Sequence, residues 1–276
     1  MLHIDPDAGK VRVVERESGR EFDEGYDQLL IATGGVPICP DLPGSGAQAI
    51  FGLSTLQSGI RVRQFVDQES PRRAVVVGGG YIGLEMAEAL VRRGLEVSLV
   101  ERSDQVMATL DPDMGALVSD ALREVGVTLY LEESLTGFEG ADGRVKAAVT
   151  DKRTLPADMV ILGMGVQPNS TLAENAGLEL GAKKAIQVDS RMRTSKAGIW
   201  AAGDCVESYH LLMQRPVHIA LGTVANKQGT VAGINLAGGD ATFPGVVGTA
   251  VSKICKYEVA RTGLREADLK EMNMPY

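Results

Sequence analysis

The chain has 276 residues, of which 44% are hydrophobic and 23% charged, a composition typical of a folded globular protein. Its net charge of −8 and its lack of a basic run argue against nucleic acid as a partner, because phosphate binding needs clustered lysine and arginine. No apolar stretch has the length of a membrane span, and no signal peptide is recognisable. The wide spacing of the cysteines suits a reducing cytoplasm, where we expect the protein. The three cysteines and three histidines are too scattered to predict a disulfide framework or a metal site.

The N-terminal segment (3–37) is predicted to form a β-meander that leads into a buried strand. Short apolar runs alternate with turn-forming residues, and the run LLIATGG closes the segment. Thr33 and Gly34 therefore follow directly after a strand.

The most informative segment is VVVGGGYIGLEMAEALVRRGLEVSLVE (75–101), which has the pattern of a strand, a glycine turn, a helix and a second strand. Gly78 permits the tight turn, Gly80 lets the backbone approach a pyrophosphate, and Gly83 lets helix and strand pack closely. The unpaired N–H groups at the start of the predicted helix (84–93) favour negative charge. We therefore predict a dinucleotide site here rather than a purely structural glycine turn.

Glu101 ends the second of these strands, 21 residues after Gly80. An acid in this place can accept hydrogen bonds from an adenosine ribose. It favours NADH, because a carboxylate repels the additional phosphate of NADPH, and the neighbouring Arg102 reduces that repulsion.

Further along the chain, Asp111 is predicted to cap a helix that begins at Pro112 and runs to about Val125. A short strand (127–130) and a second β-meander with a buried strand (135–168) follow. The two meanders belong to one internal repeat, since three pairs of residues are each 131 positions apart: Asp27 and Asp158, Gly34 and Gly165, Pro37 and Pro168.

The two copies of the repeat are unequal. The second has a βαβ unit before its meander, whereas the first opens directly on the meander, and the C-terminal tail begins new strands and a helix. We therefore expect the chain to be a fragment that is open at both ends and lacks a first glycine motif.

Three further segments accompany the glycine motif in a fixed order: YDQLLIATGGVP (26–37), GMGVQPN (163–169) and TSKAGIWAAGDC (194–205). Together they resemble the FAD-dependent pyridine nucleotide-disulfide oxidoreductases. The later run HIALGTVANKQGTVAGINLAGG looks most like the branch that contains coenzyme A-disulfide reductases and NADH oxidases.

The resemblance implies an α/β fold with two Rossmann-like domains, each carrying a β-meander. An NAD-binding domain (72–188) would be inserted into a partial FAD-binding domain (1–70 and 189–243), and residues 244–276 would begin a C-terminal dimerisation domain. A full-length protein of this kind is expected to be a homodimer.

On the FAD side, the resemblance implies that Asp204 hydrogen-bonds the ribityl chain, the alternative being a simple turn or helix cap. Thr33 and Gly34 match a second FAD-contact motif. Leu221 and Gly222 begin a helix whose positive end is directed at the flavin.

On the NAD side, Gly80, Ile82 and Gly83 match the residues under the pyrophosphate, and Gly165 lies beside the cofactor. The resemblance assigns two residues to catalysis: Tyr81 covers the flavin until nicotinamide displaces it, and Glu85 lies near the nicotinamide. Their alternatives are ordinary surface packing for Tyr81 and a favourable acid in the first helical turn for Glu85.

The function implied is an NADH-dependent flavoprotein oxidoreductase that passes electrons through FAD to a disulfide, persulfide or oxygen-type acceptor. The redox cysteine of the family is expected upstream of Met1, and Cys205 is interpreted as a small buried residue. Two alternatives stay open: a flavin-dependent reductase of ferredoxin or rubredoxin, and a non-catalytic NADH-binding redox module.

Overall fold

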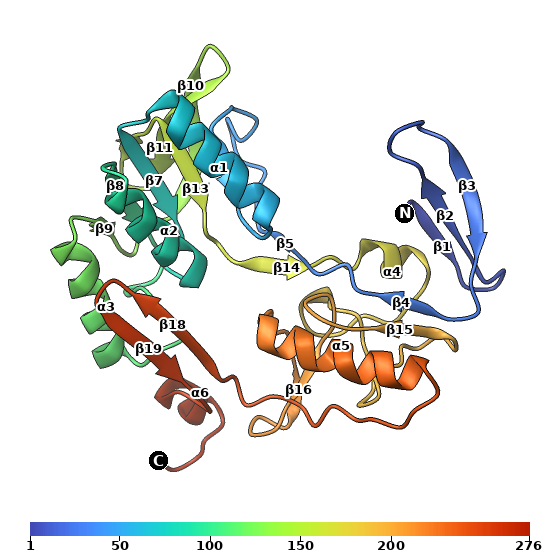
Figure 1. Cartoon of the computed structure of the whole chain (residues 1–276). Helices are drawn as coiled ribbons and strands as arrows, with labels where there is room; N and C mark the ends of the chain where they lie inside the picture. The colour runs from blue at the N-terminus through green and yellow to red at the C-terminus, as the bar shows by residue number, and fades with distance from the viewer. The chain divides into compact units, whose positions relative to one another are not determined.

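The computed structural model describes all 276 residues and divides into two compact units (Figure 1). Unit 1 comprises Met1–Val36 and Gln167–Thr249, and unit 2 comprises Pro37–Val166 and Ala250–Tyr276. Unit 2 is therefore mostly an insertion in unit 1. The predicted fold class, α/β with one Rossmann-like domain inserted into another, is confirmed.

A five-stranded parallel sheet forms the centre of unit 2. Its strands, in spatial order, are β6 (Ile50–Gly52), β13 (Met159–Leu162), β7 (Arg73–Val77), β8 (Glu96–Val100) and β9 (Thr128–Tyr130). The apolar run of β7 is buried throughout from Ala74 to Val77 because packed layers cover both faces of the sheet.

Helices α2 (Tyr81–Arg92) and α3 (Pro112–Glu124) of unit 2 come from the predicted helical segments, whereas α1 (Leu56–Glu69) was not predicted. Helix α2 begins three residues earlier than predicted. Asp111 is the N-cap residue of α3, as predicted, although its carboxylate makes no hydrogen bond to the helix N–H groups. Its Oδ1 instead accepts from the backbone N–H of Glu266 at 3.0 Å.

Each unit contains an antiparallel meander, as predicted. The strands are β1 (His3–Asp5), β2 (Lys10–Val14) and β3 (Glu21–Gly25) in unit 1, and β10 (Leu135–Ala141), β11 (Arg144–Thr150) and β12 (Thr154–Pro156) in unit 2. Two short strands, β5 (Gly35–Pro37) and β14 (Val166–Pro168), pair where the chain passes between the units.

The internal repeat also holds at the level of strand pairing. In unit 1, β4 (Leu29–Ile31) pairs in parallel with β15 (Ile199–Ala201), and Leu29 is opposite Ile199. In unit 2, β13 pairs with β6, and Val160, 131 positions after Leu29, is opposite Ile50. The second edge of β13 is occupied by β7, whereas no strand occupies the second edge of β4. The two copies therefore differ by the strand that carries the glycine motif.

The remaining elements of unit 1 are short apart from one helix: α4 (Thr171–Asn175), a 3-10 turn (Ala182–Lys184), β16 (Ser208–His210), β17 (Arg215–Val217) and α5 (Gly222–Leu236). None of the helices in the molecule combines the length and apolar composition that a bilayer crossing requires.

The C-terminal tail forms the predicted strands and helix: β18 (Ala250–Ile254), β19 (Tyr257–Arg261) and α6 (Glu266–Glu271). It belongs to the compact unit 2, where Ile254 and Cys255 join the core and the N–H of Cys255 donates to Glu88 on α2 at 2.8 Å.

The boundaries of the compact units differ from those of the expected domains. Residues 37–70 group with unit 2, and residues 167–188 group with unit 1.

Candidate dinucleotide sites

The glycine turn of unit 2 lies where β7 leads into α2. Gly78 has a φ of +104°, and a Cβ atom on it would lie 2.5 Å from the carbonyl oxygen of Gly163. A Cβ on Gly163 would lie 2.7 Å from the Cα of Gly83. Strand β7, helix α2 and the end of β13 therefore touch backbone to backbone, and no side chain fits among them.

Gly80 has the opposite environment. No atom lies within 4 Å of the position a Cβ would take, and Gly80 is the N-cap of α2 with no side-chain cap. The first turn of α2 contains no acid, so its free N–H groups and the positive end of the helix dipole have no internal partner. β7 and β13 leave the sheet at its topological switch point, where ligands bind in doubly wound sheets. The arrangement is suited to a pyrophosphate.

Glu101 is held in place by the glycine turn itself. Its Oε2 accepts from the N–H of Gly79 at 2.6 Å, and its Oε1 accepts from the N–H of Ser103 at 2.9 Å. The carboxylate oxygens keep free lone pairs, so they can still accept ribose hydroxyls. Arg102 is exposed and makes no hydrogen bond or ion pair.

The other residues predicted for the NAD site occupy the same end of the sheet. Tyr81 and Ile82 are half-buried in the first turn of α2, and Tyr81 packs against the core. Glu85 is exposed, and its Oε1 accepts from the hydroxyl of Ser252 on β18 at 2.7 Å. Gly165 has a φ of +95° and accepts from the N–H of Ile38 at 3.0 Å.

The predicted FAD residue Asp204 lies in the turn that follows β15. Its Oδ1 is buried and has no hydrogen-bond partner. Burial raises the pKa of this carboxyl above its ordinary value, and the nearby His218 opposes the rise. His218 itself places Nε2 at 2.8 Å from the backbone oxygen of Asp204. Buried acceptors without a partner are rare in folded proteins, and this oxygen is free to accept a hydrogen bond from a ligand.

Helix α5 begins near this turn, and a Cβ on Gly203 would lie in ordinary contact with Ala225 in its first turns. Leu221 is the N-cap and supplies no side-chain cap, and a Cβ on Gly222 would have no neighbour within 4 Å. The free N–H groups at this helix start are therefore accessible to an anionic group.

Thr33 and Gly34 follow β4, as predicted. The hydroxyl of Thr33 donates to the backbone oxygen of Asn169 at 2.5 Å, so this side chain already has a structural partner. Gly34 has a φ of +71°, and its carbonyl accepts from the N–H of Asn169 at 2.9 Å. A Cβ on it would meet no atom within 4 Å, so the space beside its Cα is free.

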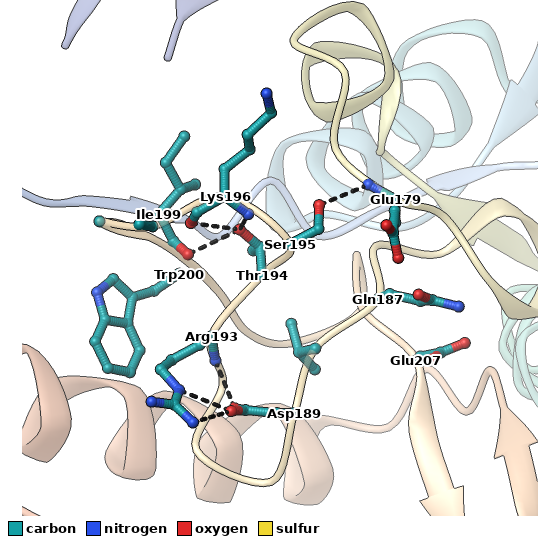
Figure 2. A pocket seen from close by; sticks show the side chains of 13 residues that line it. Glu179, Gln187, Asp189, Arg193, Thr194, Ser195, Lys196, Ile199, Trp200 and Glu207 are labelled. Atoms are coloured by element: carbon teal, nitrogen blue, oxygen red, sulfur yellow. Dashed lines mark hydrogen bonds and ion pairs between the residues drawn. The ribbon is translucent and has the colours of Figure 1, made fainter. Parts of the chain in front are cut away.

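A cavity of about 550 Å³ opens elsewhere in unit 1 (Figure 2). None of the residues predicted for cofactor binding lines it. Its polar groups satisfy one another: Arg193 pairs with Asp189, the hydroxyl of Ser195 accepts from the N–H of Glu179 at 3.0 Å, and that of Thr194 donates to the carbonyl of Ile199 at 2.8 Å (Figure 2). The unpaired Asp204 and the open glycines therefore lie outside this cavity.

Two residues of these sites were not predicted from the sequence. Gly163 precedes Gly165 in the run GMG, and its contact with Gly83 depends on the pairing of β13 with β7. Gln228 is fully buried on α5 and bonds the N–H of Gly203. A polar residue at helical spacing from Val231, Ala232 and Asn235 was the available signal for it.

Comparison with known proteins decides the family. The family model of the pyridine nucleotide-disulphide oxidoreductases matches residues 1–229. The chain belongs to this family. FAD and a pyridine nucleotide are the cofactors of such proteins, and the residues present fit both: Asp204 offers an unpaired buried acceptor, and Gly80 leaves the start of α2 open.

Individual relatives agree with this placement. The chain is 38% identical to an NADH oxidase of Methanocaldococcus jannaschii, over 99% of the chain and 61% of the relative. It is 39% identical, with a TM-score of 0.94, to a NAD-dependent persulfide reductase from A. fulgidus, over 99% of the chain and 50% of that structure. A FAD-dependent oxidoreductase of the same family from Desulfovibrio vulgaris is 38% identical with a TM-score of 0.92, over 98% of the chain and 68% of that structure. The chain thus spans about 60% of the length of the curated relatives.

A third structure bears on Glu101. A NADPH oxidase engineered from the Lactobacillus brevis NADH oxidase is 29% identical with a TM-score of 0.93, over 99% of the chain and 60% of that structure. Its substitutions replace an aspartate by alanine and put arginine and serine directly after it, and another replaces a glycine eighteen residues earlier. Gly83 precedes Glu101 by the same spacing, and Arg102 and Ser103 follow Glu101.

Proposed function

We propose that this chain is the NADH- and FAD-binding part of a flavoprotein oxidoreductase that passes electrons from NADH through FAD to a disulfide, persulfide or oxygen-type acceptor. The observation that carries the proposal is the buried, unpaired Oδ1 of Asp204 in a chain that also has an open dinucleotide turn at Gly80. A module that only sensed NADH would have no use for the Asp204 turn.

Unit 2 would bind NADH. Backbone N–H groups from Gly80 to Gly83 would bind the pyrophosphate, and Glu101 would accept the ribose hydroxyls while it fixes Gly79. Gly165 would line the cofactor. We keep Tyr81 and Glu85 as the residues closest to the nicotinamide, with Tyr81 shielding the flavin face and Ser252 orienting the carboxylate of Glu85.

Unit 1 would bind FAD. Asp204 would accept a ribityl hydroxyl, Thr33 and Gly34 would contribute backbone contacts, and Leu221 and Gly222 would direct the positive start of α5 at the flavin. When bound, the flavin accepts hydride from NADH and releases two electrons in a second half-reaction. The protein's own contribution is binding, orientation and a positive helix end where negative charge develops.

The proposed acceptor is supported by the names of several relatives. Relatives named as an NADH oxidase and a persulfide reductase support an oxygen or sulfur acceptor. Structures of a ferredoxin reductase and of putidaredoxin reductase are less similar, with TM-scores of 0.85 and 0.82, so reduction of a protein partner is the second candidate. We further propose that the full-length protein is a cytoplasmic homodimer.

Anaerobic mixing of the full-length gene product with NADH tests the proposal. We expect it to purify with FAD and to lose its visible flavin absorbance on addition of NADH. Re-oxidation by coenzyme A disulfide, a persulfide, oxygen or an iron–sulfur protein then identifies the acceptor. A protein that binds NADH but no flavin would instead be the redox-sensing module.

Glu101→Ala is expected to weaken NADH binding about tenfold or more, because it removes the ribose acceptor and leaves the N–H groups of Gly79 and Ser103 unpaired. NADPH binding should fall less, since charge repulsion is lost at the same time, and Glu101→Arg should reverse the preference. The measurement is the ratio of the NADPH and NADH dissociation constants, which does not depend on the fraction of folded protein.

Arg102→Ala is the matched control. The exposed guanidinium of Arg102 has no protein partner and is free to bind a 2′-phosphate, so its removal should weaken NADPH and leave NADH almost unchanged. An NADPH/NADH ratio that neither substitution alters would remove both residues from the cofactor site.

A further inference from the structure

We propose that Gln228 is a positioning residue that fixes the Asp204 turn against the start of α5, and that FAD affinity depends on it. The inference rests on the proposed binding of FAD to unit 1. It concerns a residue that makes no contact with the ligand itself.

Both ends of the Gln228 amide are used inside the protein. The side chain has no exposed surface. Its Oε1 accepts from the N–H of Gly203 at 3.0 Å, and its Nε2 donates to the hydroxyl of Ser208 at 2.9 Å. The amide thus spans the loop from one side of Asp204 to the other.

This bridge decides where Asp204 lies. Gly203 has a φ of +88°, so the chain turns sharply there. Besides Gln228, two side chains bond this backbone: His218 meets the oxygen of Asp204, and the thiol of Cys205 meets the oxygen of Ala202. Gln228 lies on the second turn of α5, the helix whose uncapped start is the other half of the flavin site. One buried amide therefore sets the position of the carboxylate relative to the helix N–H groups.

Asn235 provides an internal comparison. It lies seven residues later on the same buried face of α5 and is also almost fully buried. Its side chain makes three hydrogen bonds, at 2.7 to 2.9 Å, to the backbone of Arg191 and Ala241. It fixes the far end of the helix and has no bond to the Asp204 turn. If Gln228 served only to stabilise the fold, replacing it or Asn235 would have the same effect on FAD affinity.

The test compares Gln228→Met with Asn235→Leu in the full-length gene product. Three quantities are measured: the melting temperature of the flavin-free protein, the FAD dissociation constant from flavin fluorescence, and the reduction potential of the bound flavin. Both variants should lower the melting temperature. Gln228→Met should also weaken FAD about tenfold and make the potential more negative, because the start of α5 no longer stabilises the reduced flavin. Asn235→Leu should change FAD affinity less than twofold.

Two further variants sharpen the result. Ser208→Ala removes one partner of the bridge and should weaken FAD about threefold, which keeps the test available if Gln228→Met does not fold. In an Asp204→Ala background, Gln228→Met should cause no further loss of FAD affinity, because it acts through Asp204.

Equal FAD affinities in the Gln228 and Asn235 variants, or additive losses in the double variant, would overturn the positioning role while leaving FAD binding intact. A wild-type protein that binds no FAD would overturn the proposed function, and with it this inference.

Discussion

Gly80→Ala is expected to weaken NADH binding at least tenfold while the protein stays folded. The new methyl group has no protein atom within 4 Å, and the backbone φ of −86° suits alanine, so the fold tolerates it. Replacement of an N-cap glycine costs about 1 kcal/mol or less, which corresponds to a fall of about 2–4 °C in melting temperature. The methyl group instead occupies the space through which a pyrophosphate reaches the N–H groups of α2. Calorimetric titration with NADH and thermal unfolding measure the two effects.

Gly78→Ala is the control, with the reverse pattern. At φ +104° alanine is strained, and its Cβ would lie 2.5 Å from the carbonyl oxygen of Gly163. We expect a loss of roughly 3 kcal/mol in the free energy of unfolding from strain and overpacking together. If Gly80→Ala destabilised the protein as much as Gly78→Ala, or left NADH binding intact, the glycine turn would serve the packing of strand and helix and would not bind NADH.

Asp204→Ala is expected to stabilise the flavin-free protein and to abolish most of its FAD affinity. A buried polar atom without a partner costs about 1–3 kcal/mol, and alanine removes that cost. The melting temperature at pH 7 should therefore rise by a few degrees. The same substitution deletes the proposed ribityl acceptor, so the purified full-length protein should lose its yellow colour.

The stabilisation by Asp204→Ala should depend on pH. Burial raises the pKa of Asp204 in the folded protein above its unfolded value, so the charged form is disfavoured by folding. The cost is complete above the raised pKa and vanishes below the unfolded value near 4. The difference in melting temperature between variant and wild type should therefore be largest at pH 7 and smallest near pH 4. A variant that is less stable than wild type at pH 7 and retains flavin would contradict the assignment.

The sequence was sufficient where local chemistry decides the structure. The apolar run of β7, the glycines after it and the acid at the end of β8 are close in the chain, so their geometry could be predicted. The repeat with its offset of 131 positions related β4 to β13, and each of these two strands pairs in parallel with a strand from a distant part of the chain.

Long-range pairings could not be predicted in the same way. The contact of Gly163 with Gly83 arises only when β13 pairs with β7, and the bond of Ser252 to Glu85 joins residues 167 positions apart. Asp111 is the N-cap residue of its helix, as predicted, but its carboxylate accepts from the N–H of Glu266, 155 positions away, and this bond could not be read from the sequence. Gln228 was overlooked because a glutamine at a buried helix position shows no partner in the sequence.

The most direct test of the account is a titration of the isotope-labelled 276-residue chain with NADH, followed amide by amide by NMR. We predict that the N–H signals of Gly79 to Gly83 and of Glu101 to Ser103 shift first and saturate together. Shifts confined to Lys196, Trp200 and their neighbours around the cavity of Figure 2, with the Gly80 amide unaffected, would contradict it.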